Sequence, residues 1–290
     1  MGSSQVWKNR TAVISGGSNG LGRALALALS QQSANVVIIG RDPDRLASVR
    51  EQCLEAGAQS VSVVSLDVRQ LAAGKGSLVD FEIASKPAFG ESLRAVLAVQ
   101  GCDLLINAIG KSDRGLLGQL TAADLTEQFE LNVLATHAMT RFCFPALCQS
   151  RGVVVNIASL AGIVPGPGMG GYSMSKHALV GLHRQWRIES DSSGVHFLLV
   201  CPGPIQRDDT LDRYSDIVQS RGLDPVSQRP GGGVALGRLD PDGLSQKILQ
   251  AAAQRRWELI VPGKVRLLAM LMAIWPSFVD RIIRKKMKRP

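Results

Sequence analysis

Apolar segments typical of buried β-strands alternate along this chain with segments whose apolar residues recur at helical spacing. Uninterrupted apolar strands separated by helices are typical of a parallel sheet that helices cover on both faces. The alternation therefore predicts the α/β class, with a single doubly wound domain and a mainly parallel sheet. The expected strands are residues 11–15, 35–39, 61–66, 103–106, 153–157 and 195–200, and the first two expected helices are residues 21–30 and 43–56.

Two segments break this regular pattern. Residues 70–87 lack clean periodicity and are expected to form an irregular helix or an inserted loop. Residues 202–242 are rich in proline, glycine and charge, and long segments of this kind are often lids over a site. We therefore expect one catalytic domain over residues 1–263 with a lid at about 203–241, followed by a tail at 264–290.

Composition excludes several classes of protein. With 290 residues, of which 45% are hydrophobic and 20% charged, the chain has an ordinary globular composition and is not a disordered one. Its five cysteines form no Cys-x-x-Cys pair and its four histidines show no metal-ligand spacing, so we expect reduced thiols and no metal site. No apolar signal segment follows Met1, which favours a cytoplasmic location.

A glycine-rich segment, Ser-Gly-Gly-Ser-Asn-Gly-Leu-Gly from Ser15 to Gly22, lies between the first expected strand and the first expected helix. Glycine at such a turn lets the backbone approach a pyrophosphate, which the N–H groups and dipole of the helix N-terminus attract. A plain turn also uses glycine, but this position in the chain favours a dinucleotide site.

Tyr172 and Lys176 are four residues apart, so on a helix they share one face. A phenol is a poor acid–base group at neutral pH, and a neighbouring ammonium lowers its pKa towards the working range. Ser159 follows an apolar strand, where its hydroxyl could bind a substrate carbonyl. Asn132 falls within an expected helix, an unfavourable place unless its side chain or a local kink has a use. A solvated helix face is the alternative explanation of the Tyr–Lys pair alone.

Together, these motifs resemble the short-chain dehydrogenase/reductase family over about residues 8–262. The resemblance is carried by the spacing of Gly16, Gly20 and Gly22, and by the Tyr172–Lys176 pair 13 residues after Ser159. It implies an NAD(P)-binding Rossmann domain and an oxidoreductase that interconverts a ketone or aldehyde and an alcohol by hydride transfer. The chain departs from the family pattern at Ser15, where threonine is usual, and in Asn107-Ala108-Ile109-Gly110, where only the first asparagine and the glycine of Asn-Asn-Ala-Gly remain.

The same resemblance implies a role for each site residue. Tyr172 would be the general acid in reduction and the base in oxidation, and Lys176 would tune it and bind the nicotinamide ribose. Ser159 would orient the carbonyl or alcohol, and Asn132 would support a water that relays protons. The implied cofactor contacts are Ser15, Gly16, Ser18, Asn19, Gly20, Leu21, Gly22, Arg41, Asp67, Val68, Asn107, Gly110, Tyr172, Lys176, Pro202, Gly203 and Ile205.

The second expected strand ends in Ile39-Gly40-Arg41-Asp42, which bears on the choice of cofactor. An NAD-preferring member would have an acidic residue at the strand end, where Gly40 stands here. Arg41 suits a 2′-phosphate, so NADP(H) is favoured. Two alternatives stay open: Asp42 could bind the ribose, which would allow NAD(H), and Arg41 could be a solvated surface residue.

The basic charge is concentrated at the C-terminus. Residues 255–290 hold ten basic and two acidic residues, against 23 and 22 in the rest of the chain. Residues 267–275 are apolar but shorter than the roughly 18–20 residues that span a bilayer. Beyond Pro276, apolar and basic residues alternate at helical spacing, which predicts a basic amphipathic helical tail. Two interpretations stay open: the tail packs on the body or another subunit, or it lies on an anionic membrane surface. No stacking aromatics accompany the charges, so nucleic acid is not an expected partner.

The sequence thus favours an NADP(H)-dependent carbonyl reductase or alcohol dehydrogenase acting on a small carbonyl or alcohol. A tail in contact with a membrane would favour a lipophilic substrate such as a steroid, retinoid or long-chain keto compound. The alternatives are a soluble 3-oxoacyl thioester reductase and a non-catalytic NADP(H)-binding scaffold docked by its tail. The resemblance also implies a homo-dimer or homo-tetramer, formed through helices at residues 132–148 and 172–191.

Overall fold

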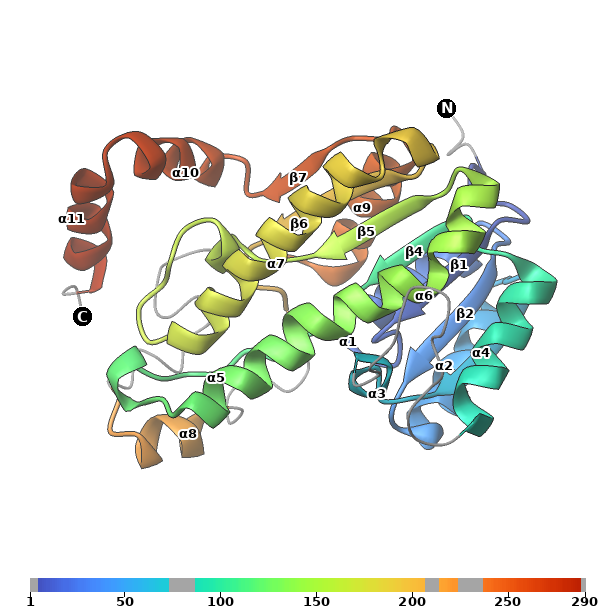
Figure 1. Cartoon of the computed structure of the whole chain (residues 1–290), viewed down its shortest axis with the longest axis horizontal. Coiled ribbons are helices and arrows are strands. Elements are labelled where there is room, and N and C mark those ends of the chain that lie inside the picture. Colours follow the sequence, from blue (N-terminus) through green and yellow to red (C-terminus); the bar gives the residue numbers. More distant parts are fainter. Residues whose placement is uncertain (1–4, 73–86, 207–213, 224–236, 288–290) are drawn as a thin grey trace.

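The described residues, 5–72, 87–206, 214–223 and 237–287 of a computed structural model, form a seven-stranded sheet (Figure 1). Every strand pair in it is parallel, in the order β3-β2-β1-β4-β5-β6-β7. The expected doubly wound α/β fold is confirmed. The strands are β1 (Thr11–Ser15), β2 (Asn35–Gly40), β3 (Ser60–Ser65), β4 (Leu104–Asn107), β5 (Val153–Ile157), β6 (His196–Pro202) and β7 (Glu258–Val261).

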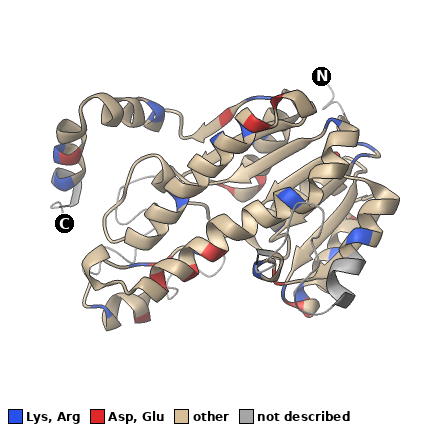
Figure 2. Cartoon of the chain, viewed as in Figure 1, with Lys and Arg blue, Asp and Glu red and all other residues tan. Residues whose placement is uncertain are grey.

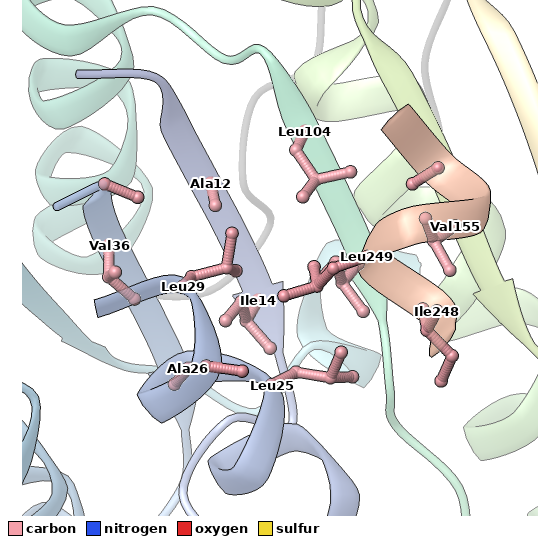
Figure 3. Close-up of a cluster of buried hydrophobic side chains, with 14 of the residues drawn as sticks. Ala12, Ile14, Leu25, Ala26, Leu29, Val36, Leu104, Val155, Ile248 and Leu249 are labelled. Atoms are coloured by element: carbon pink, nitrogen blue, oxygen red, sulfur yellow. The ribbon is translucent and has the colours of Figure 1, made fainter. Parts of the chain in front are cut away.

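Helices cover both faces of the sheet (Figure 1). Alternate residues of each central strand point to opposite faces. Ile14 therefore belongs to a cluster with side chains of α1 and α9 (Figure 3) and of α2, whereas Val13 belongs to a cluster with side chains of α4 and α6. The helices are α1 (Gly20–Ser30), α2 (Pro43–Glu55), α3 (Arg69–Ala72), α4 (Pro87–Gln100), α5 (Ala122–Phe129), α6 (Ala135–Ser150), α7 (Gly170–Glu189), α8 (Ser215–Ser220), α9 (Pro241–Ala253), α10 (Val265–Ile274) and α11 (Pro276–Met287).

The strand order changes direction at β1, which lies between β2 and β4. The chain therefore winds outward in opposite directions from β1 and from β4, and the loops that leave these two strands diverge. In open α/β sheets such a divergence opens a crevice outside the carboxyl ends of the strands. The fold thus dictates where a ligand can bind before any side chain is considered.

The ends of the predicted strands agree with the structure to within two residues, but some elements were not predicted. The sequence prediction missed β7, a short strand at the sheet edge whose four residues are all half-buried, and it did not include α9. Of the irregular segment expected at residues 70–87, α3 and the start of α4 are described and residues 73–86 lie outside the described residues. Most of the expected lid, residues 207–213 and 224–236, also lies outside them.

The tail forms two helices, α10 and α11, with a break at Trp275, where the backbone leaves the helical region before Pro276. Proline at the first position of α11 is compatible with a helix start because its missing N–H would have no helical partner there. No helix in the described part of the chain has the length and apolar content needed to cross a bilayer.

His183 of α7 lies fully buried against the sheet. Its Nδ1 is 3.2 Å from Asn156 Nδ2, its ring meets the edge of Phe197, and its Nε2 has no hydrogen-bond partner among the described residues. Burial, reinforced by the nearby positive charges of Arg187 and Arg184, lowers the pKa of His183 to about 3. The folded protein therefore holds this imidazole in its neutral form.

This burial predicts a loss of stability in mild acid. Below the ordinary histidine pKa near 6.5, the unfolded chain binds a proton that folded His183 does not, so the free energy of unfolding falls as pH drops from about 6.5 towards 3. We expect His183→Gln to remove about 2 kcal/mol of the loss that the wild type shows between pH 6.5 and pH 5, measured by urea unfolding. The exposed His177 of the same helix provides the control for replacing a histidine with glutamine. An identical acid limb in His183→Gln and wild type would contradict the prediction.

Candidate active site

A cleft of about 1580 Å³ lies at the carboxyl ends of the strands. The glycine-rich loop, the ends of β2, β5 and β6, the first turns of α7 and both tail helices line it. Of the residues predicted for the site, Ser15, Asn107 and Asn132 are not on its surface and all the others are. The fold therefore brings together in one cleft motifs that span nearly 190 residues of sequence, from Gly16 to Ile205.

The glycine-rich loop makes two approaches that no side chain would allow. Gly16 has a φ of +78°, and a Cβ there would lie 3.1 Å from the Ala108 carbonyl oxygen. A Cβ at Gly22 would collide with the Gly16 carbonyl oxygen. Asn19 caps α1, because its Oδ1 accepts a hydrogen bond of 2.7 Å from the backbone N–H of Gly20. The loop thus brings the N-terminus of α1 to the cleft, and this cradle fits a pyrophosphate.

Ser15 and Asn107 lie buried behind the loop. The hydroxyl of Ser15 donates to Asn107 Oδ1 over 3.1 Å, and Asn107 Nδ2 donates to Asn156 Oδ1 over 2.9 Å. These bonds join β1, β4 and β5 at their carboxyl ends. Threonine, which is usual at this position, carries the same hydroxyl, so serine can make the same bond. Both residues hold the strand ends in place, and direct cofactor contact by either one stays a prediction.

The end of β2 carries no acidic side chain at Gly40, and a Cβ there would lie 2.8 Å from Ser18 Oγ, so a larger residue would have to displace the Ser18 hydroxyl. Asp42 caps α2: its Oδ1 accepts from two backbone N–H groups of the first turn, and its Oδ2 is 3.0 Å from Arg45 Nε. Arg41 is exposed at the cleft. The carboxylate of Asp42 is therefore occupied, while the Arg41 guanidinium faces solvent beside the cleft.

Asp67 and Val68 follow β3 as the sequence predicts. The carboxylate of Asp67 accepts hydrogen bonds from the Arg69 guanidinium, 3.1 Å to Nε and 2.5 Å to Nη2, and the pKa of Asp67 is lowered chiefly by those bonds. Val68 is buried and also lines the cleft. The carboxylate therefore stays ionised at neutral pH and is fixed at the edge of the cleft.

Tyr172 and Lys176 lie in the first two turns of α7 and both line the cleft. Lys176 is 3% exposed, its Nζ donates to the Ile157 carbonyl oxygen over 3.0 Å, and it lies 5.9 Å from the centre of the Tyr172 ring. Burial lowers the pKa of Lys176 to about 8. The pair is therefore not a solvated helix face: the ammonium is buried beside a half-buried phenol.

Asn132 lies in a π-helical segment, Glu130–Leu134, between α5 and α6. Such a bulge frees backbone groups and is frequent at functional sites. The Asn132 side chain is fully buried: its Oδ1 accepts from the Lys111 backbone N–H over 3.1 Å, and its Nδ2 donates to Ser175 Oγ over 2.9 Å. The local distortion expected from an asparagine inside a helix is present at that residue.

Gly110 lies close to both Asn132 and Lys176. A Cβ at Gly110 would lie 3.0 Å from Asn132 Oδ1 and 3.2 Å from Lys176 Nζ. The loop after β4 thus passes directly over these two polar side chains. The sequence indicated Gly110 as a cofactor contact, and the structure adds this close approach as a physical reason for glycine.

Ser159 lies just after β5 and caps the short 3₁₀ turn Leu160–Gly162, where its Oγ accepts from the Ala161 backbone N–H over 3.1 Å. That bond uses an acceptor lone pair, so the hydroxyl hydrogen can still be donated. Pro202, Gly203 and Ile205 continue the lining from the end of β6. Ser159 is thus available as a donor in the same cleft as Tyr172.

A cluster of polar side-chain contacts lies at the mouth of the cleft, and no sequence motif predicted it. Ser112 Oγ hydrogen-bonds Tyr214 Oη, and the buried Arg114 guanidinium lies 3.9 Å from the centre of the Tyr214 ring. Arg221 pairs with Asp113 over 2.8 Å. These contacts fasten the part of the expected lid that carries α8 to the loop after β4. Sequence reasoning missed them because the partners are about 100 residues apart.

The sequence model of the family described as short chain dehydrogenase matches residues 10–216. The chain belongs to this family. It is 24% identical over 285 residues to dehydrogenase/reductase SDR family member 7B of Danio rerio, covering 97% of this chain and 87% of that protein. It is 27% identical over 283 residues to ketoacyl reductase HetN of a Nostoc species, covering 95% and 88%.

Two solved dehydrogenase structures are also similar. One is the Thermococcus sibiricus alcohol dehydrogenase complexed with 5-hydroxy-NADP, at a TM-score of 0.66 and 25% identity over 87% of this chain and 95% of that one. The other is a Mycobacterium paratuberculosis short chain dehydrogenase bound to NAD, at a TM-score of 0.71 and 19% identity over 88% and 97%. This short-chain dehydrogenase is therefore an NAD(P)-dependent oxidoreductase with a Rossmann fold. No group of three potential metal ligands gathers anywhere in its described residues.

The close approach at Gly110 predicts a large effect of one methyl group. In Gly110→Ala, the new Cβ must displace Asn132 or Lys176, and displacement by a fraction of an ångström should lower kcat by about ten-fold or more. Steady-state kinetics with a carbonyl substrate found by screening measures the effect. The matched control is Gly181→Ala in α7, where a Cβ meets nothing within 4 Å. Equal kcat values in the two variants would sink the prediction.

Proposed function

We propose that this short-chain dehydrogenase is an NADP(H)-dependent reductase or dehydrogenase that interconverts a lipophilic ketone or aldehyde and its alcohol. The observation that carries the proposal is the buried Lys176 ammonium beside Tyr172, inside a cleft that also contains a dinucleotide cradle. Burying a cation costs free energy because water no longer solvates it. A buried ammonium beside a phenol stabilises the phenolate, which matches the acid–base chemistry of the family.

In this proposal Tyr172 moves the proton. It donates a proton to the carbonyl oxygen in reduction and accepts one in oxidation, while the Lys176 charge lowers the phenol pKa. Ser159 donates a hydrogen bond to the same substrate oxygen. Asn132 acts from behind the cleft, where it fixes the Lys111 backbone and Ser175, and so supports the water that would pass the proton to solvent.

The cradle residues would hold NADP(H), which when bound supplies or accepts the hydride. Gly16, Gly20 and Gly22 would admit the pyrophosphate at the N-terminus of α1. Asp67 and Val68 would border the adenine, and Lys176 would bind the nicotinamide ribose. Pro202, Gly203 and Ile205 would flank the nicotinamide.

The preference for NADP(H) is supported by the end of β2. Asp42 is held by helix capping and by Arg45, so it is poorly placed to bind ribose hydroxyls. Arg41 and Ser18 lie at the cleft with nothing acidic at Gly40 to repel a 2′-phosphate. Of the two similar structures, one holds an NADP derivative and the other NAD, so they do not distinguish between the two cofactors.

The lipophilic substrate class is supported by the cleft wall beyond the Tyr–Lys pair. Its apolar members come from the turn after β5 and from both tail helices: Leu160, Val164, Met169, Val265, Leu268, Ile282 and Ile283. Residues 203–241 would form the lid and residues 1–263 the catalytic domain. A second candidate is a 3-oxoacyl thioester reductase, which the similarity to the ketoacyl reductase HetN favours. A screen that includes a 3-oxoacyl thioester separates the two.

The proposed assembly is a homo-dimer or homo-tetramer formed through the helices at residues 132–148 and 172–191, with exposed Phe129 just before the first of them. Large apolar side chains are exposed on these helices without a covering element in the described chain: Phe129, Leu134, Met174 and Ile188. A cytoplasmic location, with the tail on a membrane surface, completes the proposal.

The acid–base role is tested by removing one hydroxyl. Tyr172→Phe should lower kcat by about 10²- to 10⁴-fold, while NADPH binding, followed by nicotinamide fluorescence, persists. The chain has two tyrosines, and Tyr214→Phe is the matched control: it breaks the bond to Ser112 and should lower kcat far less than Tyr172→Phe. Full turnover in Tyr172→Phe would refute the proposed mechanism. Absence of turnover in the wild type across the screen, with NADPH still bound, would favour the scaffold.

The cofactor preference is tested at Arg41. Loss of a charge-assisted contact to the 2′-phosphate in Arg41→Ala should weaken NADPH binding by about 10- to 100-fold and leave NADH binding nearly unchanged. Arg50→Ala, an exposed arginine of α2 outside the cleft lining, should change neither. Tighter binding of NADH than NADPH by the wild type would reverse the assignment and point to Asp42.

A further inference from the structure

The two tail helices expose an apolar surface that the rest of the chain leaves uncovered. None of the ten residues of α10 is buried, and its neighbours Trp275 and Phe278 stack on each other at 5.3 Å. We call Leu267, Met270, Ile274, Trp275 and Phe278, which are 39% to 81% exposed, the outer face. Five large apolar side chains clustered within twelve residues exceed the scattered exposure that is normal for a soluble surface.

Positive charge accompanies this outer face. Arg281 and Arg284 are exposed in α11, and Asp280 is a distant partner of Arg284 at 4.0 Å. Figure 2 shows basic segments at the start of α10 and along α11. The sequence after Arg284 adds Lys285, Lys286, Lys288 and Arg289. Apolar and basic side chains on a short helix suit the boundary between lipid headgroups and acyl chains. An anionic bilayer is complementary to both features, whereas a second basic copy of this tail would be repelled by its charge.

The opposite side of α10, and part of α11, belong to the cleft. Val265 and Leu268 of α10, with Ile282 and Ile283 of α11, line the cavity that contains Tyr172. Figure 1 shows α10 and α11 as an arm that extends from β7 beyond the sheet. The arm thus has one apolar side towards the reacting groups and another towards the surroundings.

We propose that α10 and α11 seat the enzyme on an anionic bilayer through the outer face, and that their inner side forms the wall past which a bilayer-dissolved substrate enters the cleft. Neither helix is long enough to span a bilayer, so the arm lies in the interface. Docking stands independently of catalysis, while the entry route rests on the proposed function.

Docking is tested by co-sedimentation of the full chain with phosphatidylcholine vesicles, with and without phosphatidylserine. The wild type should pellet with the anionic vesicles and much less with the neutral ones, and added salt should weaken the binding. The double variant I274E/W275E should lower the pelleted fraction by at least about ten-fold. The matched control is Val99→Glu in α4, which is 86% exposed and remote from the arm. Retained NADPH binding in the double variant shows that it is folded.

Three outcomes would overturn docking: no pelleting of the wild type, equal pelleting of wild type and double variant, or equal loss in Val99→Glu. If light scattering shows that the double variant only dissociates a dimer, and vesicles do not bind, the outer face is an interface between copies.

The entry route has its own readout. The double variant should raise KM for a long-chain ketone presented in vesicles and not for a short, water-soluble ketone, and equal KM changes for both would overturn the route. Because pelleting needs no turnover, failure of docking and failure of the proposed chemistry are observed separately.

Discussion

The candidate active site depends on keeping one charged group, the Lys176 ammonium, inside the protein. Taking a cation out of water is costly, and a pKa lowered to about 8 records that cost. The structure offsets part of it with the Ile157 carbonyl oxygen, which is left available at the end of β5 because the strand stops there. The carboxyl end of a central strand thus supplies the anchor, and the first turns of α7 are held against the sheet.

The neighbouring polar residues follow from that anchor. An ammonium held beside the loop after β4 leaves no space for a side chain at Gly110, and the backbone there runs close enough for Lys111 to bond Asn132. Asn132 lies in the π-helical segment, where the backbone hydrogen bonds span five residues instead of four. From this position its amide reaches both the loop after β4 and Ser175. The π-helical segment, the glycine and the buried cation therefore form one arrangement, and a change in any one of them displaces the others.

Sequence patterns were informative wherever a local rule governs structure. Uninterrupted apolar strands separated by helices identified the sheet, glycine between strand and helix identified the cradle, and helical spacing placed Tyr172 beside Lys176. They failed where the deciding contact is distant in sequence: the Ser112–Tyr214 bond, or the pairing of β7, which is too short and half-exposed to show a pattern. Asp42 illustrates the same limit, since a carboxylate in sequence does not show whether it caps a helix or awaits a ligand.

The position of the arm follows from the topology. Because β7 runs parallel to β6, the chain leaves β7 at Val261, on the same edge of the sheet where β6 ends at Pro202 and the cleft begins. Any segment that continues from β7 must start beside the active site. Here the continuation is apolar on two sides, so it can cover the cleft only by exposing the other side to its surroundings. The exposed apolar surface therefore lies next to the substrate entrance. Contact with a lipid bilayer would remove this surface from water and so lower its free-energy cost.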